Sequence, residues 1–131
     1  SESVLIGQEK NHNKNKNVLS SMKSTVNQFI NLIKSKKISL DTIGNLLDEN
    51  WELKKQLADN VSNKFINKCY TEAKKKGSLG GKILGAGNGG FLLLLAKKTN
   101  HKKIQKSLKK LGLERYSFKL ENSGSRIINN F

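Results

Sequence analysis

The sequence predicts an α+β domain in which helices pack on a small antiparallel sheet, in the order α-α-α-β-β-α-β. Up to Gly77, apolar residues recur at the three- and four-residue spacing of amphipathic helices. After Gly77, short apolar or alternating runs separated by glycine indicate strands, with one more helical stretch among them. The length of 131 residues fits one domain over 1–131 with a modest core.

Three helices are expected before Gly77. The first spans about 18–37, with apolar residues at Met22, Val26, Phe29, Ile30 and Ile33. The second begins after Ser39, a residue that caps helices well, and ends near Asn60. The third follows Ser62 and ends at Gly77, a helix-stop signal.

Three residues in these helices have predicted structural roles. Gly44 costs a helix interior about 1 kcal/mol relative to alanine, so we expect it to pack closely against another element. Trp51 is expected in the core or at a domain interface. Cys69 is expected to be a small core residue, not a nucleophile.

The second half predicts two strands, a helix and a last strand. The strands at 82–86 and 91–97 flank a glycine-rich loop, and the all-apolar start of the second indicates a strand covered on both faces. Thr99 or Asn100 then caps a helix that Gly112 ends. Alternation of Tyr116, Phe118 and Leu120 with polar residues predicts a half-buried strand. Residues 1–17 are polar, and 11–17 are expected to be a loop or a frayed helix start; the tail from Glu121 is expected to be a loop.

Composition limits the classes of partner. The net charge is +15, but 23 of the 25 basic residues are lysine, whereas nucleic-acid interfaces favour the bidentate fork of arginine. The chain also has no basic strand interleaved with base-stacking aromatics, so nucleic acid is not expected as a partner. No apolar run approaches the ~20 residues that span a bilayer, and no signal peptide is recognisable, so no membrane partner is expected. The single cysteine gives no disulfide framework and suggests a cytoplasmic location.

The glycine-rich loop at 85–90 is the principal candidate site. It holds four glycines in six positions, and successive backbone N–H groups in such a loop can form an anion-binding nest. Three known glycine motifs do not fit. A dinucleotide-binding fingerprint would be followed by a helix, but an apolar, strand-like run follows here. A Walker loop would continue with Gly-Lys-Ser/Thr, and a protein kinase would carry His-Arg-Asp and Asp-Phe-Gly; the sequence has none of these. The alternative is a glycine-rich hairpin with a purely structural role, which lets two sheets or domains approach closely.

A fourth pattern fits the segment Gly80–Phe91, GGKILGAGNGGF. It resembles the third conserved motif of the GHMP small-molecule kinases. Further segments resemble the C-terminal portion of D-glycero-D-manno-heptose 7-phosphate kinases: Trp51–Lys55, Ser62-Asn63, Ala73–Gly77 and Ser123–Ile128. The similarity runs from about Ser3 to Ile128 and departs at Asn88, where that subfamily usually has glycine. Asparagine tolerates left-handed backbone better than other side-chain-bearing residues, so the loop shape can survive.

The resemblance implies a ferredoxin-like GHMP-kinase C-terminal domain whose first strand would lie just upstream of Ser1. It implies that the whole enzyme uses ATP and Mg²⁺, bound mainly by an N-terminal domain absent from this chain. The substrate would be a sugar phosphate, phosphorylated at the anomeric hydroxyl to feed surface-polysaccharide precursors. The phosphate-binding Gly/Ser motif and the catalytic acid belong to that other domain. We therefore expect no catalytic residue and no metal ligand here, and no activity from this chain alone.

The resemblance also implies what the loop does. It would pack against the phosphate-binding loop of the other domain and shape the sugar-phosphate pocket. The residues concerned are Gly85, Ala86, Gly87, Asn88, Gly89 and Gly90.

Other candidate residues carry weaker predictions. Lys54, Lys55 and Arg126 are possible phosphate contacts, although a solvated helix face explains the two lysines as well. His12 and His101 lie in polar stretches without metal-ligand spacing and are interpreted as surface residues. The acids of the second helix look like a solvated face: Asp41, Asp48, Glu49, Glu52 and Asp59.

The competing hypothesis is a non-catalytic basic domain that binds nucleic acid or another anionic partner. The distribution of lysine discriminates between the two. Scattered lysines favour the kinase, and one contiguous basic face favours the binding module.

Overall fold

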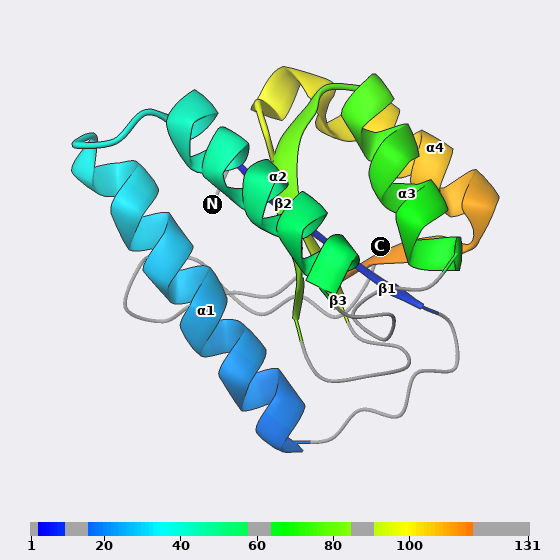
Figure 1. Ribbon diagram of the computed structural model, residues 1–131, viewed down its shortest axis with the longest axis horizontal. Helices are drawn as coiled ribbons and strands as arrows, with labels where there is room; N and C mark the ends of the chain where they lie inside the picture. Colours follow the sequence, from blue (N-terminus) through cyan, green and yellow to red (C-terminus); the bar gives the residue numbers. More distant parts are fainter. Residues whose placement is uncertain (1–2, 10–15, 58–63, 85–90, 117–131) are drawn as a thin grey trace.

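A computed structural model of the chain describes residues 3–9, 16–57, 64–84 and 91–116. It confirms the predicted fold class, since helices cover a four-stranded antiparallel sheet (Figure 1). The elements in chain order are β1 (Val4–Glu9), α1 (Lys16–Ser35), α2 (Leu40–Leu57), α3 (Lys64–Lys75), β2 (Ser78–Leu84), β3 (Phe91–Ala96), the short 3₁₀ helix η1 (Lys98–Asn100), α4 (His101–Leu111) and β4 (Leu113–Tyr116). None of the helices in the described ranges is long and apolar enough to cross a bilayer.

The first strand corrects the sequence prediction. No strand was predicted within residues 1–17, and the first strand of the fold was expected upstream of Ser1; instead β1 lies within the chain, between β3 and β4. The sheet order β2-β3-β1-β4, with every neighbour antiparallel, is that of a ferredoxin-like sheet. β1 has no clear sequence signal, because its residues do not alternate between apolar and polar. Three consecutive apolar residues are followed by Gly7 and two polar residues.

Both faces of the sheet are buried. Phe91, Leu93 and Leu95 of β3 join a cluster with residues of α1 and the first half of α2. Leu92 and Leu94 join a second cluster with residues of α3 and α4. All six side chains of β3 are buried, which confirms the prediction of a strand covered on both faces.

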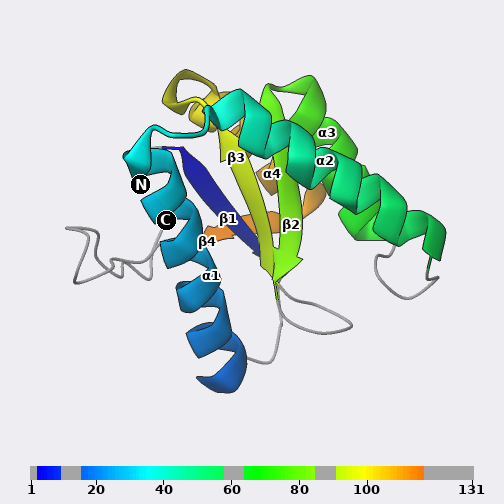
Figure 2. The ribbon, with the colours of Figure 1, turned by 60° about the vertical axis from the view of Figure 1, so that its left-hand side comes forward.

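Helix α2 packs closely on the edge strand β2, and two glycines allow it (Figure 2). A Cβ built on Gly44 would lie 2.5 Å from Leu79 Cβ, and a Cβ on Gly80 would collide with the carbonyl oxygen of Gly44. The predicted close approach at Gly44 is therefore confirmed, and its partner is β2.

Predicted helix ends agree with the structure at Ser39, Gly77 and Gly112, whereas the predicted cap at Thr99 or Asn100 does not: both belong to η1, and Asn100 makes no side-chain capping hydrogen bond. Ser39 caps α2, because its Oγ accepts a hydrogen bond from the backbone N–H of Thr42 at 3.1 Å. Gly112 ends α4 at φ 103°, and Gly77 follows α3 at φ 111°, both in the left-handed region that favours glycine.

Two strand boundaries differ from the predictions. β2 begins at Ser78 instead of residue 82, because Gly80 and Gly81, which carry no side chain to show alternation, belong to the strand. β4 begins at Leu113, earlier than the predicted start at Tyr116. Phe118 and Leu120 lie outside the described residues.

His101 is a correction, since it was expected on the surface. It is only 8% exposed, and its Nε2 lies 3.0 Å from the carbonyl oxygen of Ala96. The neutral ring can donate this hydrogen bond from Nε2. His12, the other histidine, lies outside the described residues.

Burial of His101 predicts a pH dependence of stability. Burial, aided by the positive charges of Arg115 and Lys98, lowers the pKa of His101 below its ordinary value of 6.5. The unfolded chain therefore binds a proton that the folded chain resists, and the contribution to stability is lost as pH falls below about 6.5. We expect the urea midpoint of the wild type to fall more steeply between pH 7.5 and 5.5 than that of His101→Gln. Parallel pH profiles of the two proteins would contradict the assignment.

Candidate functional site

The described part of the candidate site is the β2–β3 hairpin that carries the glycine-rich loop. Leu84 and Phe91 are paired across the two strands, so the loop begins and ends at a closed hairpin (Figure 2). The segment after Gly90 is a strand and not a helix, which agrees with rejecting the dinucleotide-binding motif. Residues Gly85, Ala86, Gly87, Asn88, Gly89 and Gly90 themselves lie outside the described residues, so their predicted role stays a prediction.

A buried serine anchors the start of the hairpin. Ser78 is 4% exposed, and its Oγ lies 3.2 Å from the carbonyl oxygens of both Gly80 and Leu95. The register of β2 against β3 shifts between Ser78 and Gly80. A local irregularity frees backbone carbonyl groups, and the hydroxyl supplies a donor for them.

A polar cluster ties α2 and α3 to the outer edge of β2. The hydroxyl of Tyr70 donates a hydrogen bond to Oδ1 of Asp48 at 2.6 Å. Nζ of Lys74 lies 3.3 Å from Oδ2 of Asp48 and 3.5 Å from the carbonyl oxygen of Leu79. An edge strand exposes unpaired backbone groups, and this cluster covers part of that edge.

The electrostatics of the cluster keep the phenol protonated. Burial, reinforced by the carboxylate of Asp48, raises the pKa of Tyr70 well above its ordinary value. Asp48 was predicted to belong to a solvated acidic face; it is instead half-buried and engaged by two partners. Nothing in the local sequence links Asp48 to Tyr70, because they are 22 residues apart on different helices.

Trp51 continues this cluster into the core. Its ring stacks on Tyr70 with centroids 4.3 Å apart and planes 5° from parallel, and it is 5% exposed. The core alternative predicted for Trp51 is thus confirmed. Cys69, also predicted as core, is fully buried in the same cluster.

The lysines predicted as phosphate contacts lie on α2. Lys54 is exposed, and Nζ of Lys55 lies 3.1 Å from Oε1 of Glu52, one turn before it. An exposed pair of this kind contributes at most about 1 kcal/mol, so both ammonium groups could still turn to an anionic ligand. Arg126, the third candidate, lies outside the described residues.

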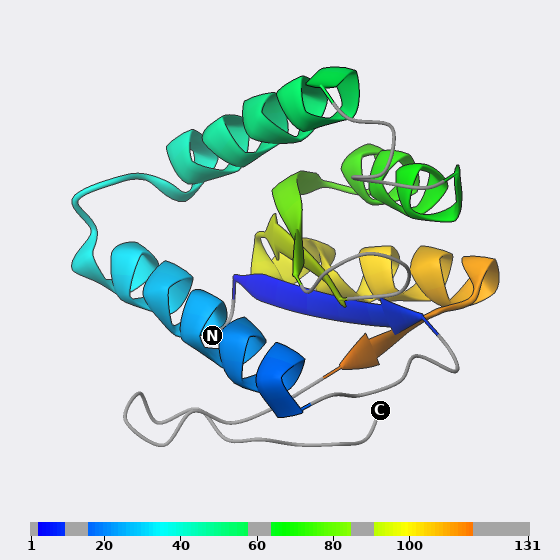
Figure 3. The ribbon, with the colours of Figure 1, turned by 60° about the horizontal axis from the view of Figure 1, so that its bottom comes forward.

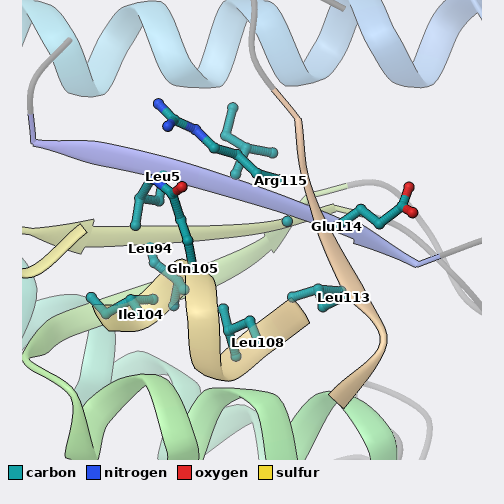
Figure 4. A pocket seen from close by; sticks show the side chains of 10 residues that line it. Leu5, Leu94, Ile104, Gln105, Leu108, Leu113, Glu114 and Arg115 are labelled. Atoms are coloured by element: carbon teal, nitrogen blue, oxygen red, sulfur yellow. The ribbon is translucent and has the colours of Figure 1, made fainter. Parts of the chain in front are cut away.

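A small hollow lies between α4, β1 and β4, on the α3/α4 side of the sheet (Figure 4). Its apolar lining residues also belong to the core cluster on that side: Leu5, Leu94, Ile104, Leu108 and Leu113. The hollow is therefore continuous with the core, and its polar residues are Gln105 from the middle of α4 and Glu114 and Arg115 from β4.

The comparison with protein families decides what this fold is. A family model described as "GHMP kinases C terminal" matches residues 30–113, which is more than half of the chain. The chain belongs to this family. The resemblance on the glycine-rich segment is thereby confirmed, since that segment lies within the matched range.

Two curated relatives of this GHMP kinase C-terminal domain are sugar kinases. It is 37% identical over 79 residues to the bifunctional fucokinase/GDP-fucose pyrophosphorylase of Arabidopsis thaliana, covering 56% of this chain and 7% of that protein. It is 33% identical over 69 residues to the D-glycero-alpha-D-manno-heptose 7-phosphate kinase of Campylobacter jejuni, covering 53% of this chain and 20% of the relative. The chain thus spans a fifth or less of the length of these two relatives.

A solved structure shares the fold. The crystal structure of the L. major mevalonate kinase with R-mevalonate aligns with a TM-score of 0.58 at 20% identity, covering 86% of this chain and 41% of that one. The GHMP kinase C-terminal domain therefore has the architecture of the corresponding part of a small-molecule kinase.

Proposed function

We propose that this domain is the C-terminal part of an ATP-dependent kinase that phosphorylates heptose 7-phosphate at its anomeric hydroxyl. The observation that carries the proposal is the family match over 30–113, joined to the similarity to a heptose 7-phosphate kinase. The product would be a precursor of surface polysaccharide, and the enzyme would act in the cytoplasm. Its partners would be the sugar phosphate and its own N-terminal kinase domain.

In this proposal the hairpin presents the loop from Gly85 to Gly90 to the cleft between the two domains. Paired stems at Leu84 and Phe91 and a fully buried β3 give the loop a rigid base. Glycine lets backbone N–H groups approach a phosphate or a neighbouring loop closely. Lys54, Lys55 and Arg126 would add positive charge toward the sugar phosphate.

The chemistry is assigned to the other domain. Phosphoryl transfer needs a metal-bound nucleotide and a residue that orients the attacking hydroxyl. Asp48 is not available as a base, because Tyr70 and Lys74 engage its carboxylate. Within the described ranges no three His, Cys, Asp or Glu side chains gather as a metal site. ATP and Mg²⁺ would be held mainly by the N-terminal domain.

The test is an ADP-release assay on the longer gene product that contains this sequence, run beside the 131-residue chain. Heptose 7-phosphate, fucose and mevalonate are offered separately with ATP and Mg²⁺. We expect turnover of heptose 7-phosphate by the long form only, with a new anomeric phosphate in the ³¹P NMR spectrum. Turnover of another substrate alone would refute the heptose assignment, and turnover by the 131-residue chain would refute the division of roles.

A further inference from the structure

One surface of the molecule carries a concentration of positive charge that the proposed kinase role does not explain. Helices α3 and α4 lie side by side on one face of the sheet (Figures 1 and 3). Their inward residues fill the core, and their outward residues are largely lysine. The basic face comprises eight exposed lysines: Lys64, Lys68, Lys75, Lys102, Lys103, Lys106, Lys109 and Lys110.

Acidic residues are nearly absent from this part of the chain. From Lys64 to Leu113 there are 13 lysines and one acid, Glu72. The helix acids gather on α2 instead, and the ion pairs of Lys55 and Lys74 are both made with acids of α2. Among the described residues, none of the eight lysines of the basic face forms an ion pair with a carboxylate. The charge is thus segregated between helices and not dispersed over the surface.

This segregation has an energetic cost to the fold. Lys102, Lys106 and Lys110 follow one another at four-residue spacing on α4, where like charges destabilise a helix by a few tenths of a kcal/mol per pair. Alternating signs would have stabilised the same exposed face. An anionic partner that neutralises the face would offset the repulsion.

We propose that the basic face binds the surface of an anionic lipid bilayer. Clusters of four to eight basic residues on an amphipathic helix are typical of contact with acidic headgroups, at about 1 kcal/mol per lysine near the surface. The face is all lysine, and ammonium groups act as point charges that need no oriented acceptor. The apolar face of α4, with Ile104 and Leu108, is buried in the core, so the contact is peripheral and does not involve insertion.

Nucleic acid fits the same face less well. The eight positions include no arginine for bidentate contacts and no aromatic residue for base stacking. Two packed helices present a broad layer, whereas single strands are bound in grooves that follow their backbone. By the lysine criterion given above, one contiguous basic face favours an anion-binding role, and such a role can accompany the kinase assignment. That no helix of the described residues could cross a bilayer concerns insertion, not contact with headgroups.

The test is sedimentation of the 131-residue chain with vesicles of phosphatidylcholine, with and without phosphatidylglycerol. We expect binding only to the anionic vesicles, falling steeply as salt is raised. The triple variant Lys102→Gln, Lys106→Gln, Lys109→Gln should bind on the order of 100-fold more weakly, at about 1 kcal/mol per lysine. The matched control Lys23→Gln, Lys36→Gln, Lys37→Gln has the same net charge and should lose less than about tenfold, since these lysines lie outside the face.

Three outcomes would overturn the proposal. An equal loss in both triple variants would show that net charge alone drives the binding. No binding of the wild type to anionic vesicles at low salt would exclude the lipid partner. A short RNA duplex is added as a competitor. If it displaces the protein from the vesicles at a concentration below the lipid concentration needed for half-maximal binding, the face is assigned to nucleic acid. Circular dichroism of each variant verifies that the exposed substitutions leave the fold unchanged.

Discussion

Replacing Gly80 by valine is expected to lower the free energy of unfolding by about 3 kcal/mol, the upper part of the usual range for overpacking. The new Cβ would clash with the Gly44 carbonyl oxygen, and backbone cannot move aside as a flexible side chain can. Helix α2 would have to withdraw from β2. That movement would also pull Asp48 away from Tyr70, because Asp48 lies one turn further along α2.

Urea denaturation of Gly80→Val, followed by circular dichroism, measures the effect. Asn45→Ala is the matched control, because Asn45 is exposed on α2 beside Gly44 and alanine favours helix, so its stability should be unchanged or slightly raised. Gly44→Ala tests the other side of the contact: its Cβ would lie 3.0 Å from the backbone carbon of Leu79, so it should destabilise despite the better helix propensity. A stable Gly80→Val protein with a wild-type midpoint would contradict the packing described for this contact.

The positions of helices and strands could be predicted from the sequence wherever a local residue pattern indicated them. Helical spacing and the stop signals at Gly77 and Gly112 located the helices, and the apolar run of β3 indicated burial on both faces. Gly44 could be recognised as a packing contact because glycine within a helix is costly. β1 could not be located in this way, since its burial comes from pairing with β3 and β4, which are distant in the sequence.

The candidate site was predictable in a different sense. The glycine pattern identified the loop, and the family match over 30–113 agrees with the resemblance. The supporting contacts had no sequence signal: Asp48 and Tyr70 lie on separate helices, and the burial of His101 depends on where η1 turns after β3. Such side chains become partners only when tertiary packing brings their elements together, and single-residue propensity says nothing about that.

Asp48→Ala is expected to lower the free energy of unfolding by about 2 kcal/mol, in the range of hydrogen bonds to charged groups. The change leaves the Tyr70 hydroxyl, buried against β2, without its acceptor, and it removes the carboxylate that faces Lys74. Tyr70→Phe should cost less, since the ring keeps its stacking on Trp51. Glu49→Ala, an exposed neighbour on α2, is the control and should change stability by less than about 0.5 kcal/mol.

The double variant Asp48→Ala, Tyr70→Phe tests whether loss of the Tyr70–Asp48 hydrogen bond causes the lower free energy of unfolding. If it does, the two losses will not add, and the cycle will give a coupling of about 1 kcal/mol or more. Additive losses would show that the two residues stabilise α2 and α3 separately. Coupling also bears on the hairpin, because the Lys74 ammonium group lies both 3.3 Å from the Asp48 carboxylate and 3.5 Å from the carbonyl oxygen of Leu79 in β2. The cluster would then act as a brace between two helices and the strand that leads into the glycine-rich loop.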